Sequence, residues 1–133
     1  MSPRSARSRR RHHAFVRSYD GDGALRWGRQ FGTPESDRIA RLAIGVNGFM
    51  YAAGSTLGDL SETNLGFTDA FVASLDEGGA VRRTDQFRTG GTDVAASVAV
   101  DLTGTVYVAG YVFGELVAPQ IGFVDAFVRS YGP

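Results

Sequence analysis

The stretch that decides the fold reads DAFVASLD and occupies residues 69–76. Its tripeptide Ala-Phe-Val also occurs at 14–16 and at 126–128, so successive copies lie 56 residues apart (70 minus 14, and 126 minus 70). With this offset, 14–77 aligns with 70–133 without a gap, and about 27 of the 64 positions are identical. The chain is therefore an internal repeat with a period of 56 residues.

Each period contains four segments with the pattern of a β-strand. In 69–76, side chains alternate between two faces, as in a half-buried strand. A Gly-rich turn of hairpin length follows, and then 80–87, whose polar drift between copies suits an outer edge strand. The small residues of 94–101 could form a short helix, but about eight residues between two turns favour a strand. The β-branched and aromatic residues of 105–113 predict the fourth strand.

Four strands in a repeat near 50 residues are the pattern of a β-propeller blade. The predicted fold class is all-β, with blades of four antiparallel strands and about two blades' worth per chain. With the small-residue segment innermost, the chain divides into a partial blade at 13–32, a full blade at 37–88 and a partial blade at 93–131. This division predicts nine strands. Residues 1–12 are an Arg-rich tail that we expect to be disordered and dispensable for folding.

The repeat resembles the bacterial β-propeller repeat family called SBBP. The resemblance is carried by the residues of 69–76, 86–87, 90–93 and 101–110, and it extends over 14–131. It implies a propeller of the kind found in often large, exported or surface-attached bacterial proteins. It implies no catalytic residues, because the family has no agreed chemistry.

Composition limits the functions that are open to the chain. Its 133 residues include 14 basic and 14 acidic ones, for a formal net charge of +0. All the basic residues are Arg, and five of them lie in 1–12, where clustered Arg could attract phosphate but a disordered leader is the favoured interpretation. The acidic remainder argues against a nucleic-acid platform. Cys is absent, which excludes disulfides and a thiol nucleophile, and no apolar run approaches the roughly 18 residues of a membrane span.

Two pairs of carboxylates recur at repeat positions. Asp37 matches Asp93, and Asp69 matches Asp125, whereas the first copy has His13 at that second position. Repeated carboxylates could line a channel and hold a cation. More often, such groups cap strand ends by accepting backbone N–H bonds, and we predict this role here.

Two other features resemble sites without completing them. Residues 20–23 read Asp-Gly-Asp-Gly, like the start of a calcium loop, but Ala24 and Phe31 stand where further ligands would be needed, so a tight turn is predicted. His12 and His13 follow the Arg run and are too few for a metal site. Because both His lie N-terminal to the first Ala-Phe-Val tripeptide at 14–16, no His-based triad can form within the segments that follow. No catalytic or metal-binding residue is therefore assigned, and no cofactor is expected.

The favoured function is a non-enzymatic β-propeller repeat protein that acts as a structural or interaction module, as part of a larger surface or exported propeller. One alternative is a carbohydrate or small-ligand-binding propeller assembled from several chains, in which Trp27 and the Tyr residues could stack on sugar rings. In strands, such side chains are more often packed between blades, and the repeated Tyr51 and Tyr107 lie in or next to predicted strands. Another is a fragment of a longer reading frame.

The expected partner is the chain itself, through blade completion between copies, or a missing remainder of the propeller. The final pair of inner strands at 93–113 lacks an outer partner, and the opening pair of outer strands at 14–32 lacks an inner one. The family resemblance suggests an exported or cell-surface location, although the Arg-rich tail has no signal-peptide pattern.

Overall fold

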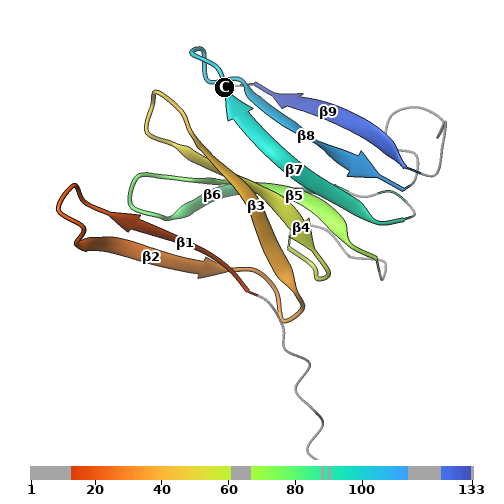
Figure 1. Cartoon of the computed structure of the whole chain (residues 1–133), viewed down its shortest axis with the longest axis horizontal. Coiled ribbons are helices and arrows are strands. Elements are labelled where there is room, and N and C mark those ends of the chain that lie inside the picture. The colour runs from red at the N-terminus through yellow and green to blue at the C-terminus, as the bar shows by residue number, and fades with distance from the viewer. Residues whose placement is uncertain (1–12, 61–66, 88, 90, 114–123, 133) are drawn as a thin grey trace, which may run out of the picture.

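The computed structural model describes residues 13–60, 67–87, 89, 91–113 and 124–132 (Figure 1). These residues form nine strands in three antiparallel sheets and contain no helix, so the predicted all-β class is confirmed. None of the described segments is therefore a helix long and apolar enough to cross a membrane. The tail predicted at 1–12 lies outside the described residues.

The three sheets follow one another along the chain. The first sheet contains β1 (Ala14–Tyr19) and β2 (Leu25–Phe31). The second sheet has the order β3 (Asp37–Ile44), β4 (Met50–Thr56), β5 (Asp69–Leu75) and β6 (Val81–Phe87). The third sheet has the order β7 (Asp93–Val100), β8 (Val106–Val112) and β9 (Asp125–Tyr131).

These strands occupy the segments predicted from the repeat. The ambiguous small-residue segments are strands, β3 and β7, which confirms the choice of strand over helix. The strands predicted to be edge strands, β2 and β6, do lie at sheet edges. The three sheets contain two, four and three strands.

Each hairpin turn is closed by local polar groups. Asp20 accepts the backbone N–H groups of Asp22 and Ala24 with its Oδ1, both at 2.9 Å. This geometry confirms the predicted tight turn at this site. Asp76 and Asp101 accept two N–H groups in the same way, and Asn47 accepts one. The positive φ that this turn requires, +82° to +89°, is supplied by Gly23, Gly48, Gly79 and Gly104.

A bulge recurs in the first hairpin of the second sheet and of the third. The register shifts once within β3, opposite Gly54, and once within β7, opposite Gly110. A Cβ atom on Gly54 would lie 1.8 Å from the carbonyl oxygen of Arg38, and one on Gly110 would lie 1.9 Å from that of Val94. Glycine is therefore required at both positions because the bulged strand approaches so closely.

The second sheet lies between the other two and packs against both (Figure 1). On the side of the third sheet, Phe87 meets Phe127 edge to face, with ring centroids 5.4 Å apart. On the side of the first sheet, Trp27 packs against the buried cluster Met50, Ala52, Phe71, Ala73 and Leu75. Every residue of β5 is buried, because this strand is covered on both faces. The prediction of a half-buried strand at 69–76 was therefore wrong.

Candidate functional site

The repeated carboxylates Asp37 and Asp93 begin β3 and β7 and are almost completely buried. Thr33 donates its backbone N–H to Asp37 Oδ2 at 2.7 Å, and Thr89 donates its own to Asp93 Oδ2 at 2.6 Å. Each Thr hydroxyl also lies within hydrogen-bond distance of its carboxylate. The predicted role as strand-end caps is confirmed at this repeat position.

The two caps differ in one contact. The hydroxyl of Thr56 donates to Asp37 Oδ1 at 2.5 Å, whereas Val112 occupies the equivalent place beside Asp93. Burial raises the pKa of Asp93 above its ordinary value of 3.8, although hydrogen bonds from Thr89 and from the backbone of Phe113 act in the opposite direction. Asp93 is thus a buried carboxylate that lacks the second Thr hydroxyl bonded to its counterpart Asp37.

We expect the replacement Asp93→Asn to change the pH dependence of stability. A raised pKa in the folded state means that the contribution of Asp93 is fully present below pH 3.8 and is lost as pH rises through the folded-state pKa. A neutral amide at this position does not titrate and has no such loss. The unfolding free energy of the variant, minus that of the wild type, should therefore increase as pH rises above 3.8 and level off once pH has passed the folded-state pKa.

Urea denaturation at several pH values measures this difference. The substitution Asp22→Asn, at an exposed turn position, is the matched control. A difference for Asp93→Asn that decreases with rising pH would contradict the expectation.

The other repeated carboxylate, Asp69, belongs to a buried polar network. Gln86 is 1% exposed and donates from Nε2 to Asp69 Oδ2 at 2.9 Å and to the carbonyl of Gly58 at 3.0 Å. Its Oε1 accepts the backbone N–H of Leu60 at 2.7 Å. The network joins the segment after β4 to β5 and β6, so it serves the fold. The sequence showed the repeat of Gln86 but not this pairing.

A cavity of about 250 Å³ lies between the second and third sheets. Tyr131 donates its hydroxyl to Asp85 across it, and Arg129 lies 3.9 Å from the same carboxylate. Burial, together with the bond to Asp85, raises the pKa of the Tyr131 phenol. Asp85 was predicted only as a polar position of an edge strand, because its partner comes from another sheet. The lining residues are Tyr51, Val72, Ser74, Arg82, Arg83, Asp85, Val106, Tyr131 and Gly132.

The aromatic residues considered for sugar stacking are placed differently from one another. Trp27 lies against Gly79, and its Nε1 donates to the carbonyl of Glu77 at 2.8 Å, so its ring lies between two sheets. Tyr51 packs against the core between the second and third sheets. Tyr107 is 43% exposed. The described residues contain no cluster of three or more His, Asp or Glu that could hold a metal ion.

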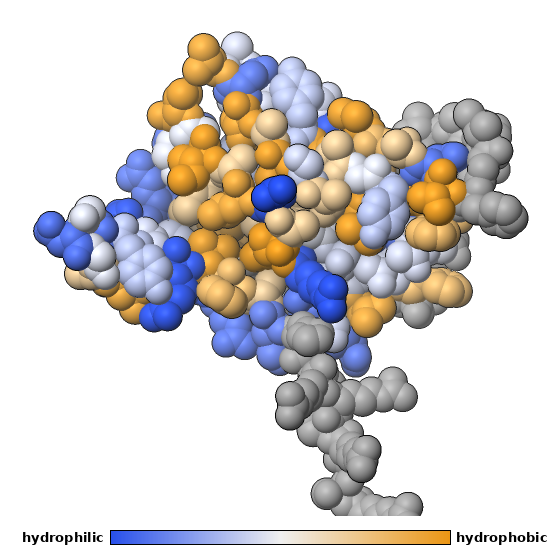
Figure 2. All heavy atoms as spheres, in the orientation of Figure 1, coloured by the Kyte–Doolittle hydropathy of each residue, from blue (hydrophilic) through white to orange (hydrophobic). Residues whose placement is uncertain are grey.

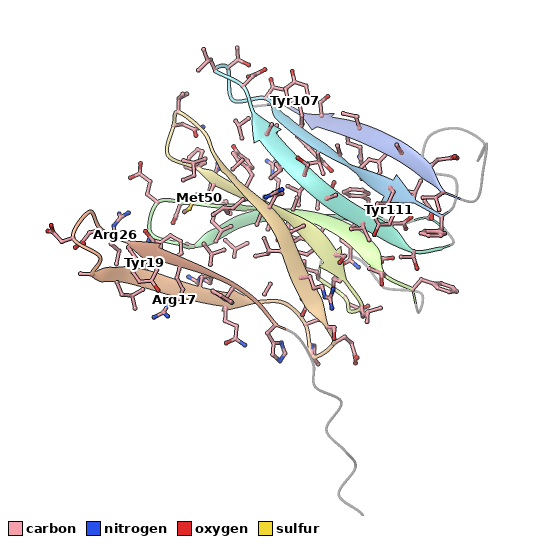
Figure 3. All side chains as sticks on the ribbon, viewed as in Figure 1. Arg17, Tyr19, Arg26, Met50, Tyr107 and Tyr111 are labelled. Atoms are coloured by element: carbon pink, nitrogen blue, oxygen red, sulfur yellow. The ribbon has the colours of Figure 1, made fainter. Side chains whose placement is uncertain are left out.

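The face of the third sheet that points away from the second is exposed and largely apolar. We call it the outer face. It contains three pairs of directly opposite residues from β8 and β9, namely Tyr107 with Ser130, Ala109 with Val128, and Tyr111 with Ala126. Figure 3 labels Tyr107 and Tyr111 on this sheet, and Figure 2 shows apolar side chains gathered on the visible side of the molecule. Val128 is 71% exposed and Tyr111 is 40% exposed.

A scan against protein-family models finds no match for the chain, and a search of curated proteins finds none either. The resemblance to the SBBP repeat therefore stays a prediction, and function has to be inferred from the residues and contacts of the molecule itself.

Proposed function

We propose that this chain is a non-enzymatic β-propeller module, built from SBBP-like repeats, that acts through its exposed sheet surfaces as a structural or protein-binding element. The observation that carries the proposal is a difference in burial between equivalent residues. Val72 is 7% exposed, whereas Val128, one period later, is 71% exposed. Val72 is covered by the third sheet, and the described residues provide no cover for Val128.

The same kind of difference is found for other residues of the outer face. Its residues Tyr107, Ala109, Ala126 and Val128 repeat Tyr51, Ala53, Ala70 and Val72 of the second sheet. In the second sheet, that surface is packed against strands β7 and β8. A surface that is buried by a neighbouring sheet in one repeat, and exposed in the next, has the residues needed to bind another sheet.

The chemistry of the chain supports a role without catalysis. Cys is absent, and both His precede β1. The buried carboxylates Asp37, Asp69 and Asp93 are engaged by Thr and Gln donors that hold strand ends and loops. A binding or structural role uses the exposed faces, which these buried groups keep in place.

We expect the purified protein to associate, and the substitution Tyr111→Glu to weaken that association at least tenfold. A carboxylate at this place on the outer face would have to lose its water when the face is covered. Sedimentation velocity over a range of concentrations measures the apparent mass against the 14.2 kDa of one chain.

The matched control is Leu102→Glu. Leu102 is 85% exposed in a turn, and its counterpart Val46 stays 73% exposed although the third sheet covers one face of the second sheet. The control should therefore associate like the wild type. Circular dichroism checks that both variants are folded. A wild-type protein that remains a 14.2 kDa monomer at every concentration overturns the proposed function.

A further inference from the structure

The first and last strands of the described chain have the same sequence. Residues 14–19 and 126–131 both read AFVRSY. Of these two identical strands, β1 pairs only with β2, and β9 pairs only with β8. Within the described residues, each of them therefore has one open edge.

The middle copy of this strand shows what both edges can bind. β5 pairs with β4 on one edge and with β6 on the other. The pairing of Ala14 with Phe31 is the pairing of Ala70 with Phe87 shifted by one period. The pairing of β9 with β8 likewise repeats that of β5 with β4. Within the described residues, β1 thus pairs with the equivalent of β6 but with no equivalent of β4. Conversely, β9 pairs with the equivalent of β4 but with no equivalent of β6.

Among the described residues, a groove lies beside the open edge of β1. This groove of about 440 Å³ separates β1 from the start of β3 and is lined by His13, Ala14, Phe15, Asp37, Arg38 and Ile39. Further along β3, Leu42 is 43% exposed and Ile44 is 68% exposed. In the third sheet, the residue equivalent to Leu42 is Val98, which is 9% exposed because it packs on the second sheet.

The uncovered surfaces at the two ends of the chain are therefore complementary. Leu42 and Ile44 lie on one side of the second sheet. The residues equivalent to them, one period later, lie on the side of the third sheet that packs against the second sheet. The residues of the outer face of the third sheet are equivalent to those of the second-sheet surface against which the third sheet packs. Within one chain, the third sheet packs against the second sheet. An equivalent contact can form between two copies, in which the outer face of the third sheet of one copy meets the Leu42 side of the second sheet of the next.

We infer that copies of this chain associate head to tail by strand exchange: β1, with β2 attached, takes the place of β9 on β8 of a neighbouring copy. This inference rests on the proposed function and names the partner as a second copy. Because β1 and β9 are identical over six residues, β8 meets the same side chains before and after the exchange. The exchanged sheet gains a fourth strand, β2, and the outer face is covered by the second sheet of the incoming copy.

Phe15 of the incoming strand has a specific binding position on the neighbouring copy. It is 66% exposed, whereas its identical counterpart Phe127 is 9% exposed and packs edge to face on Phe87. After exchange, Phe15 of the incoming copy occupies the place of Phe127 against Phe87. Arg17 similarly takes the place of Arg129, whose guanidinium carbon lies 4.4 Å from the Phe87 ring centre.

The exchange can be tested by disulfide cross-linking because the native chain has no Cys. Tyr107 pairs with Ser130 across β8 and β9, and Ser18 is the counterpart of Ser130 in β1. A double variant, Tyr107→Cys with Ser18→Cys, should form covalent dimers and longer ladders on a non-reducing gel after oxidation. Directly opposite residues of antiparallel strands have the Cα separation that a disulfide needs.

Two matched variants control for chance collisions. Tyr107→Cys with Ser74→Cys carries the second Cys at the equivalent position of β5, where both strand edges are already paired, so it should give no ladder. Tyr107→Cys with Ser130→Cys should close within one chain and stay monomeric on the gel. A ladder of equal strength in the Ser74 variant overturns the exchange.

Phe15→Ala provides a second measurement in an otherwise native chain. Because Phe15 is largely exposed, its removal should leave the melting temperature of the dilute protein unchanged and weaken association at least tenfold. Association that is unaffected by Phe15→Ala, with no ladder in the Ser18 variant, overturns the exchange and leaves the proposed function standing. A monomer at every concentration overturns both.

Discussion

Replacing Phe71 with Ala lowers the free energy of unfolding by about 4 kcal/mol, the range found for large-to-small changes in protein cores. Phe71 is completely buried in β5, an inner strand of the second sheet, in the cluster that faces the first sheet. Its removal takes apolar surface out of the core and leaves a cavity that paired strands cannot close. Because small domains are stable by only about 5–15 kcal/mol, this is a large share of the total.

The matched control is the same substitution at the same repeat position in the first strand. Phe15 is 66% exposed, so Phe15→Ala should cost less than about 0.5 kcal/mol at concentrations where the protein is monomeric. Urea denaturation followed by circular dichroism measures both variants. A loss below about 1 kcal/mol for Phe71→Ala would show that the stacking of the first and second sheets described here is wrong.

The substitution Gly54→Ala should cost about 3 kcal/mol, although it adds only one methyl group. The new Cβ would lie 1.8 Å from the carbonyl oxygen of Arg38, which belongs to the neighbouring strand and cannot rotate away. The strands would have to separate at the bulge, with loss of the hydrogen bonds on either side. Gly110→Ala should show a similar loss, because its Cβ would meet the carbonyl of Val94 at 1.9 Å.

Gly21→Ala is the control for these two variants. Gly21 has no atom within 4 Å of an added Cβ, and its φ is not positive. Its replacement should be neutral or slightly stabilising, because Ala restricts the unfolded chain. Thermal unfolding gives the melting temperatures of the three variants, and those of Gly54→Ala and Gly110→Ala should be lower than that of Gly21→Ala. Equal melting temperatures would refute the role assigned to the bulges.

The secondary structure could be predicted from the sequence because the signals are local. Alternating side chains mark β5, and Gly at fixed turn positions marks the hairpins. The bulges could not be predicted, since an extra residue in one strand depends on the strand opposite. The repeated pair Ala53-Gly54 was visible, but only the close approach of Arg38 gives the reason for that glycine.

The candidate sites were predictable to a smaller extent. The repeat identified Asp37 and Asp93, and the chemistry of carboxylates predicted that they cap strand ends. Their donors, Thr33 and Thr89, also recur 56 residues apart and could have been found from that signal. The link between Tyr131 and Asp85 depends on how two sheets pack, and no local pattern contains that information. The same limit applies to exposure, because identical strands such as β1 and β9 differ only in their neighbours.

The closed hairpin turns have a consequence for the order of folding. Each turn is held by bonds between residues at most four positions apart, such as those from Asp20 to Asp22 and Ala24. Hairpins of this kind form within microseconds, long before distant segments meet. The hairpin of β1 and β2 is therefore assembled before it finds a sheet to cover. Under the strand exchange proposed above, the third sheet of a neighbouring chain is a second sheet that this hairpin can join, so the number of linked chains should increase with the protein concentration during folding.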